Sequence, residues 1–103
     1  MTNRTHRLTV TLPGNIQPIE RGARFADPLN LALKAEGVGE TTDEGTQMGI
    51  VAGGVAVIAA DIEVTVSDLG RGLAIIRRVL RAADAPSGTT ITEHAVTKVV
   101  HQL

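Results

Sequence analysis

Apolar and polar residues alternate in two segments of the chain. Leu8, Val10 and Leu12 lie on one side of segment 7–12, with threonines on the other. Over segment 55–66 the apolar residues of one face alternate with Asp61, Glu63 and Thr65, which share the other. Period-two alternation is typical of half-buried strands, so both segments are predicted to be strands. Apolar residues fill both faces early in the longer segment, so we expect its first half to be buried on both sides.

Apolar residues at helical spacing predict two helices. Phe25, Leu29 and Leu33 are four residues apart, and Asp27 followed by Pro28 is a good helix entry, with the aspartate as cap. This helix should run to about Glu36. The second should begin after a cap at Ser67 or Asp68 and is marked by a stripe at Leu69, Leu73, Ile76 and Leu80.

The remaining segments carry weaker signals. Segment 13–26 is expected to be a polar connection, and 39–48 an exposed or edge strand, although a turn at 43–45 is an alternative. Gly49, Gly53 and Gly54 favour a hairpin connection. Strands are also predicted at 89–93 and over the tail 95–103, which contains Val96, Val99 and Val100. How 39–48 and 95–103 pair is left open.

The order of these elements predicts an α+β fold. Strand, helix, strand, strand, helix, strand fits a ferredoxin-like antiparallel sheet (βαββαβ) with two helices on one face, to which the tail adds a C-terminal strand. At 103 residues, we expect a single domain spanning 1–103.

Three stretches carry a family resemblance. They are GVGETTDEGTQM, a strand that ends in IEVTVSDL, and a helix that closes in LRAADAPSGTTI. In this order they resemble small uncharacterised bacterial ferredoxin-like proteins, some of which look like immunity proteins of toxin systems. The resemblance covers roughly residues 7 to 93, and it implies a domain that neutralises or regulates another protein. It supplies no catalytic signature.

Composition narrows the classes of function. The formal net charge is -1, cysteine is absent, and Phe25 is the single aromatic residue. A near-neutral chain without aromatic platforms does not suit nucleic acid or membrane surfaces. The absence of cysteine removes thiolate metal sites and fits a reducing cytoplasm. No targeting or spanning segment is expected, because the longest apolar run is too short and is interrupted by glycines.

Acidic residues are concentrated in the middle of the chain. From Glu36 to Asp68 there is no lysine or arginine, so the hairpin should carry an acidic patch. One interpretation is a solvated strand face that resists edge pairing. The other is a docking surface for a basic partner, with these candidate residues: Glu40, Asp43, Glu44, Asp61 and Glu63.

Basic residues are concentrated in the second helix. Arg77 and Arg81 should lie along one line of the helix, and Arg71 and Arg78 along another. Most arginines so placed keep the wet side of a helix in water. They would form an anion site only if they converged with backbone amides, and no P-loop sequence is present.

No catalytic or metal motif is recognised. His6, His94 and His101 are the only histidines, and alternation along a strand should separate His94 from Glu93 and from His101. Asp61 and Glu63 share a face, but that face is expected to be open. We therefore predict no metal, no cofactor and no catalytic residue.

Two functions from different classes remain. The first is a non-catalytic domain that binds a partner protein, or a second copy as a homodimer, through the acidic hairpin. The alternative is a small-molecule-binding or enzymatic domain with its site between the helices and the 13–26 connection. The absence of motifs favours the first.

Overall fold

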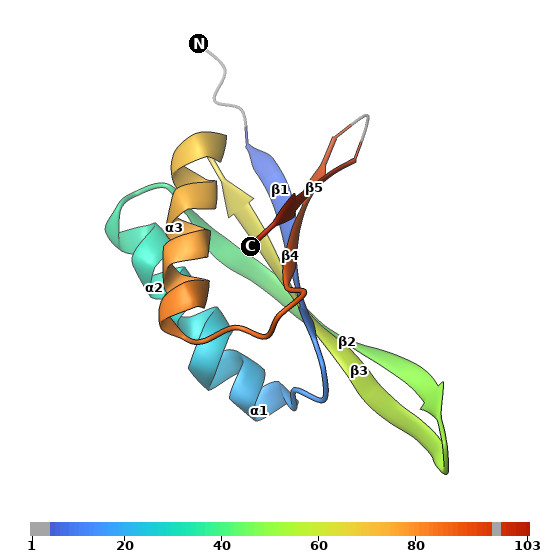
Figure 1. Cartoon of the computed structure of the whole chain (residues 1–103). Helices are drawn as coiled ribbons and strands as arrows, with labels where there is room; N and C mark the ends of the chain where they lie inside the picture. Colours follow the sequence, from blue (N-terminus) through green and yellow to red (C-terminus); the bar gives the residue numbers. More distant parts are fainter. Residues whose placement is uncertain (1–4, 96–97) are drawn as a thin grey trace.

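The fold is α+β, with a five-stranded antiparallel sheet covered by helices on one face (Figure 1). The computed structural model describes residues 5–95 and 98–103. In space the strands follow the order β2-β3-β1-β4-β5. Their bounds are β1 His6–Pro13, β2 Gly39–Val51, β3 Gly54–Val66, β4 Thr90–His94 and β5 Val99–Gln102. The helical elements are α1 Pro18–Glu20, η1 Arg21–Ala26, α2 Asp27–Ala35 and α3 Leu69–Ala82.

The core lies between the sheet and the helices. Leu8, Val10 and Leu12 of β1 are fully buried, as their alternation predicted. Ile62 of β3 and Ile76 of α3 are also fully buried in the same cluster. The central position of β1, between β3 and β4, explains its burial because both of its edges are paired.

The expectation of a polar connection over 13–26 is wrong in its second half. A continuous helical segment begins at Pro18 and passes through the π-helical η1 into α2. Proline suits a first helical position because it has no N–H that needs a partner there. The expected cap at Asp27 is also wrong, since Ala26 before it already has helical angles, φ -66° and ψ -44°. Gly37, with φ +65°, follows the end of α2.

The second helix begins as predicted. Asp68 is the cap, and its Oδ1 accepts a hydrogen bond from the backbone N of Arg71 at 3.0 Å. Ser67, the other candidate, instead donates to the carbonyl of Val38 at 3.1 Å. The first turns of α3 pass close to β3: a Cβ on Gly72 would lie 2.8 Å from Cγ1 of Val66.

Both uncertain strands exist. Segment 39–48 belongs to β2, an edge strand that extends to Val51, so the alternative of a turn at 43–45 is wrong. Beyond β4, the tail contributes β5 at the opposite edge. Val96, which was assigned to that strand, lies outside the described residues.

The first half of β3 departs from the prediction. It was expected to be buried on both faces, but Val55 and Ile58 are exposed, and burial begins only at Ala59. Pro13 pairs with Ala59, so β1 ends there and β2 and β3 continue alone as a projecting hairpin (Figure 1). Gly53 and Gly54 lie at its turn with positive φ, which agrees with the predicted hairpin connection.

Two bulges interrupt the pairing of β2 with β3. Thr41 pairs with Val64 and Asp43 with Glu63, which leaves Thr42 as an extra residue in β2. A second shift leaves Ile58 without a partner in β3. Bulges bend a strand and re-aim its side chains. The alternation predicted that Ile58 lies on the same face as Ala60 and Ile62. Because of the second bulge, Ile58 is exposed while Ala60 and Ile62 are buried.

Candidate interaction surface

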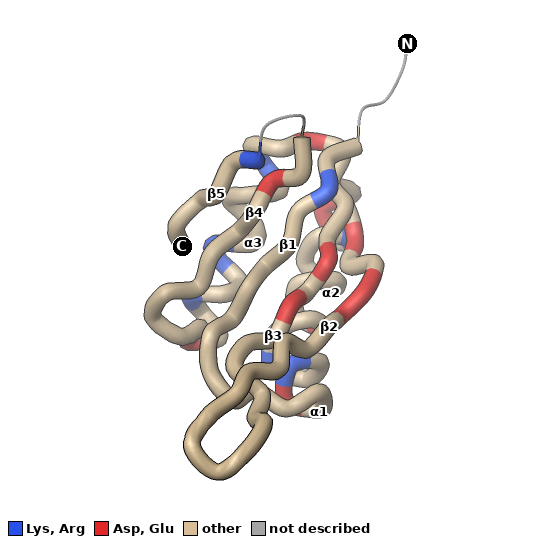
Figure 2. Tube along the Cα trace, turned by 90° about the vertical axis from the view of Figure 1, so that its right-hand side faces the viewer, with Lys and Arg blue, Asp and Glu red and all other residues tan. Residues whose placement is uncertain are grey.

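The five candidate acidic residues do not form one patch. Asp43, Asp61 and Glu63 lie on the open face of the sheet, opposite the helices. The register gives this placement: Asp43 pairs with Glu63, and Gly45 with Asp61, while the neighbours Ile62 and Val64 point into the core. Glu40 and Glu44 instead form ion pairs with residues of the helical segment. In Figure 2 the acidic positions of β2 and β3 lie on neighbouring strands.

Threonines of β1 hold the carboxylates of the open face. The hydroxyl of Thr9 donates to Oε1 of Glu63 at 2.8 Å and lies 2.6 Å from Nε2 of His94. Thr11 donates to Asp61 at 3.0 Å. The amide of Gln47 also donates to Asp61, at 3.0 Å to each oxygen. These contacts fix the carboxylates on a rigid strand while leaving them at the surface.

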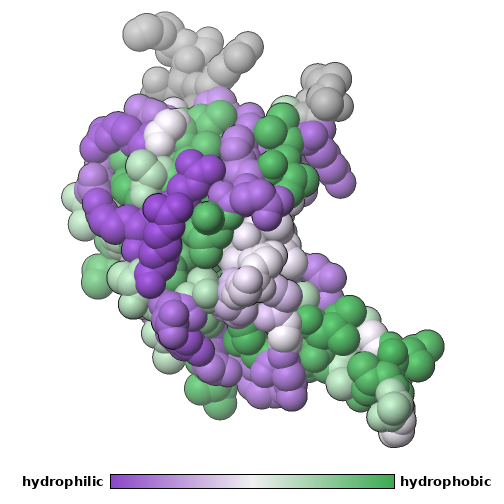
Figure 3. Space-filling view, in the orientation of Figure 1, coloured by the Kyte–Doolittle hydropathy of each residue, from purple (hydrophilic) through white to green (hydrophobic). Residues whose placement is uncertain are grey.

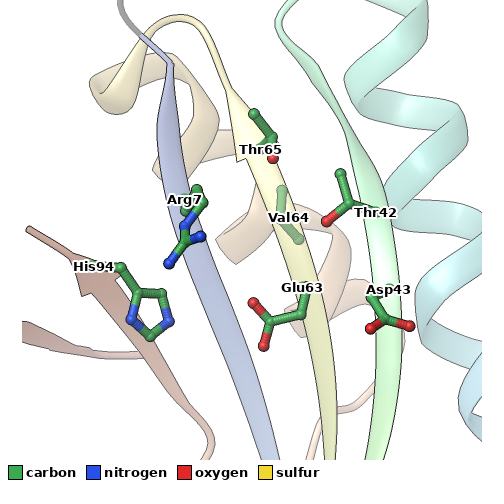
Figure 4. A pocket seen from close by; sticks show the side chains of 7 residues that line it. All are labelled: Arg7, Thr42, Asp43, Glu63, Val64, Thr65 and His94. Atoms are coloured by element: carbon green, nitrogen blue, oxygen red, sulfur yellow. The ribbon is translucent and has the colours of Figure 1, made fainter.

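A hollow of about 540 Å³ opens on this face (Figure 4). It is lined by Arg7, Thr42, Asp43, Glu63, Val64, Thr65 and His94. Arg7, His94 and Glu63 come from three neighbouring strands and border the same hollow. The mixture of one cation with carboxylates and hydroxyls is suited to binding polar groups.

Glu44 contacts a buried arginine that the sequence analysis did not single out. Arg21 of η1 is only 7% exposed, and its Nε donates to Oε1 of Glu44 at 2.9 Å. Its Nη1 donates to the carbonyl of Gly45 and to the hydroxyl of Thr46, both at 2.8 Å. Through these three hydrogen bonds, Arg21 connects the helical segment to the base of the β2–β3 hairpin.

Glu40 forms a weaker contact. Its carboxylate lies 3.8 Å from Nζ of Lys34, and both side chains are more than half exposed. Exposed pairs of this kind contribute little to stability.

The four arginines of α3 form two separate pairs. Arg78 donates to Glu36 at 2.8 Å, and Arg71 lies 3.7 Å from the same carboxylate. The hydrogen bond from Arg78 and the charges of both arginines hold the pKa of Glu36 below its usual value. Arg77 and Arg81 instead reach the carbonyls of Gln102 and Leu103, each at 3.4 Å. These four side chains are divided between two structural roles.

His94 and His101 lie apart, as alternation indicated. His94 borders the open-face hollow, whereas Nε2 of His101 lies 3.4 Å from Glu93 on the side of the helices. Within residues 5–95 and 98–103, no group of three potential metal ligands is present. In the same part of the chain, no helix is long and apolar enough to cross a membrane.

The outer part of the hairpin, residues 47–58, is an apolar surface that we call the hairpin tip. Among the described residues, nine large apolar side chains stay exposed, and five of them lie here: Met48, Ile50, Val51, Val55 and Ile58. Ile50 is the most exposed, at 92%. Figure 3 shows these green side chains gathered on the projecting end, and Figure 2 shows no charged residue there.

Both faces of the hairpin tip are apolar. The cross-strand pairs Met48–Val57 and Ile50–Val55 lie two positions apart, so they share one face. On the other face, Ile58 covers Gly49, where a Cβ would come within 2.9 Å of it. The sequence alone does not reveal this exposure, because an apolar strand has the same residue pattern whether or not other elements pack against its faces.

The chain was compared with known proteins. No protein-family model matches it, and no curated protein or solved structure matches it significantly.

Proposed function

We propose that the chain is a non-catalytic protein-interaction domain that uses the β2–β3 hairpin as its contact surface. The observation that carries this proposal is the hairpin tip, where five large apolar side chains project beyond the sheet. A contiguous patch of exposed large apolar side chains is typical of protein contact sites. Scattered apolar residues, such as Leu31 on α2, need no such explanation.

The open face next to the tip gives the surface its charge. Asp43, Asp61 and Glu63 present fixed carboxylates, so a partner that extends from the tip onto this face should be basic there. Neutralising or regulating such a partner, in the cytoplasm, is the activity that we propose.

The fold supports this proposal as a scaffold. We propose that it is a ferredoxin-like plait with one added strand. The antiparallel order β2-β3-β1-β4 supports this proposal, and β5 would be the added strand beside β4. In this arrangement one sheet face stays free of helices and available for binding.

The alternative of a small-molecule site near 13–26 has less support. A hollow lies between α2 and α3, and its polar lining residues are Arg78 of α3 and Arg24 of η1. The guanidinium of Arg24 already donates to the carbonyls of Ala83 and Asp84 and to Oε2 of Glu20. Three of its five N–H groups therefore already have protein acceptors.

A capture experiment with matched variants tests the proposed function. The chain is immobilised and exposed to lysate of its native host as wild type, as Ile50→Lys and as Leu31→Lys. Both variants place one lysine at an exposed apolar position, so only the location differs. A protein retained by wild type and Leu31→Lys but lost with Ile50→Lys supports the proposal. Equal retention by all three would refute it.

A further inference from the structure

The outer edge of β2 is protected over its first half and open at the hairpin tip. Side chains hydrogen-bond its backbone at three places: Asn30 accepts from the N–H of Thr41, Asp43 from that of Glu44, and Arg21 donates to the carbonyl of Gly45. Among the described residues, no side chain hydrogen-bonds the backbone of 47–51. Because β2 has one neighbour, β3, this stretch keeps unpaired N–H and C=O groups.

The open stretch also lacks the features that normally prevent strands from pairing. From Gly45 to Ala60 the sequence has no charged residue and no proline. The register shift between Gln47 and Met48 leaves its extra residue, Ile58, in β3, so β2 itself has no bulged residue in 47–51. Edge strands are usually protected by lysine, proline, a bulge or short length. The other edge follows that rule, since β5 spans only Val99–Gln102 and is preceded by Lys98.

We propose that a second copy of this chain docks on the hairpin tip, with residues 47–51 of the two β2 strands paired antiparallel about a two-fold axis near Gly49. This inference rests on the proposed function: it assigns the hairpin tip to a second copy and leaves the carboxylates of the open face to the basic partner. A two-fold interface requires a surface that is complementary to itself. An uncharged apolar strand meets this requirement, because no like charges face each other when it pairs with its own copy.

The charge distribution favours a copy over a basic partner at this place. A basic protein would be attracted by carboxylates, but residues 47–58 contain none. Asp61, which accepts from Gln47, lies at the inner end of the hairpin tip. In the antiparallel pair, each Glu44 lies beyond the paired segment, five residues from the axis. The net charge of -1 per chain also leaves little long-range repulsion between copies.

The pairing has a consequence for the open face. A two-fold axis perpendicular to the sheet keeps the helices of both copies on one side and both open faces on the other. The two sheets then form one ten-stranded sheet, whose open face carries two sets of Asp43, Asp61 and Glu63. The dimer would therefore offer a basic partner two equivalent acidic sites, which increases avidity without new contacts.

Molar mass in solution tests the interface. Light scattering after size exclusion, at chain concentrations from about 1 to 100 μM, should give the mass of two chains for wild type and for Leu31→Lys. Ile50→Lys should give the mass of one chain with an unchanged circular dichroism spectrum, because Ile50 is 92% exposed in the single chain. A wild type that stays monomeric at the highest concentration overturns the inference, as does a folded Ile50→Lys that stays dimeric.

Amide exchange then distinguishes strand pairing from side-chain packing. In the wild-type dimer, alternate amides within 47–51 should exchange at least tenfold more slowly than in Ile50→Lys, while amides of the core strand β1 should be unchanged. Equal exchange over 47–51 in the two proteins overturns the paired-strand geometry. The capture experiment separates the proposals, since a monomeric wild type that still loses its partner through Ile50→Lys refutes only the dimer.

Discussion

Nε of Arg21 lies 2.9 Å from Oε1 of Glu44, and this contact joins the π-helical η1 to the edge strand β2. The arginine is 7% exposed, whereas the carboxylate is more than a third exposed. Arg21 also satisfies the carbonyl of Gly45 and the hydroxyl of Thr46. One side chain therefore fixes the position from which the hairpin projects.

Replacing Arg21 should destabilise the fold more than replacing its acidic partner. Arg21→Ala removes three hydrogen bonds and should lower the free energy of unfolding by about 1 to 3 kcal/mol, since partly buried acceptors lose their donor. Glu44→Gln keeps an acceptor oxygen for Nε of Arg21 at a side chain that is more than a third exposed, so it should cost about 1 kcal/mol, less than Arg21→Ala. Urea denaturation of both variants checks this order, and equal losses would contradict it.

The same contact changes how the acidic residues can be probed. Reversing the charges of Glu40, Asp43 and Glu44 together would leave the fold intact only if all three side chains were simply exposed. A lysine at position 44 would face the buried guanidinium of Arg21 without compensation. Charge tests should therefore use Asp43, which is exposed on the open face.

The charge reversal Asp43→Lys should slow association with a basic partner. The expected rate constant falls several-fold at low salt, and the difference from wild type shrinks as salt rises, because the Debye length decreases from about 10 Å at 0.1 M to about 3 Å at 1 M. Asp27→Lys makes the same change at an exposed position on α2 and serves as the control. Surface plasmon resonance measures both, and equal slowing by the two variants would assign the effect to net charge.

Sequence spacing identified most of the buried helical stripe but missed its beginning. Phe25, Leu29 and Leu33 were recognised, and Arg21 continues the same four-residue spacing toward the N-terminus. A charged residue at a stripe position normally marks the wet side of a helix. Here its charge is compensated by Glu44, twenty-three residues away in sequence. Because that contact is tertiary, hydrophobic periodicity could not reveal it, although Pro18 was an available signal for an earlier helix start.

Truncation to alanine should cost much more stability at a buried aliphatic side chain than at an exposed one. Ile76→Ala removes a fully buried side chain and should cost about 2 to 5 kcal/mol, including the cavity that it leaves. Leu31→Ala, at a side chain that is 73% exposed, should change stability by less than about 0.5 kcal/mol. Chemical denaturation provides both values. A loss below about 0.5 kcal/mol for Ile76→Ala would contradict the packing of α3 against the sheet.

The alternation of β3 correctly predicted a strand along the whole length of 54–66. Its prediction of burial was correct only from Ala59 on. Val55 and Val57 follow a strand pattern as well as Ile62 and Val64 do. Burial also needs a second layer, and β1 ends at Pro13, opposite Ala59. The acidic candidates show the same limit. Residue type predicted an acidic patch, whereas the ion pairs of Glu44 with Arg21 and of Glu40 with Lys34 depend on the position of the helical segment.

Stability should fall in acid partly through Glu36. Arg78 and Arg71 lower the pKa of this carboxyl in the folded state. A lowered folded-state pKa adds stability that is present above the unfolded-state pKa and is lost as pH falls through the folded-state pKa. Arg78→Gln should therefore raise the pKa of Glu36, as measured by NMR titration of its side-chain carbons. Arg77→Gln, on the neighbouring line of α3, should leave that pKa unchanged. If both variants shift it equally, the effect comes from net charge rather than from the Arg78 contact.

Two glycines in the first turns of α3 should respond in opposite directions to alanine. Alanine favours a helix interior over glycine by about 1 kcal/mol. At Gly70 a Cβ would meet only Oδ1 of Asp68, at 3.7 Å, so Gly70→Ala should stabilise the protein by about 0.5 to 1 kcal/mol. At Gly72 a Cβ would lie 2.8 to 2.9 Å from three side-chain atoms of Val66, which is fully buried. Overpacking of this kind costs about 1 to 3 kcal/mol and exceeds the helical gain, so Gly72→Ala should be destabilised. Thermal unfolding of the two variants decides the point, and a higher melting temperature for Gly72→Ala would show that α3 and β3 are further apart than this contact requires.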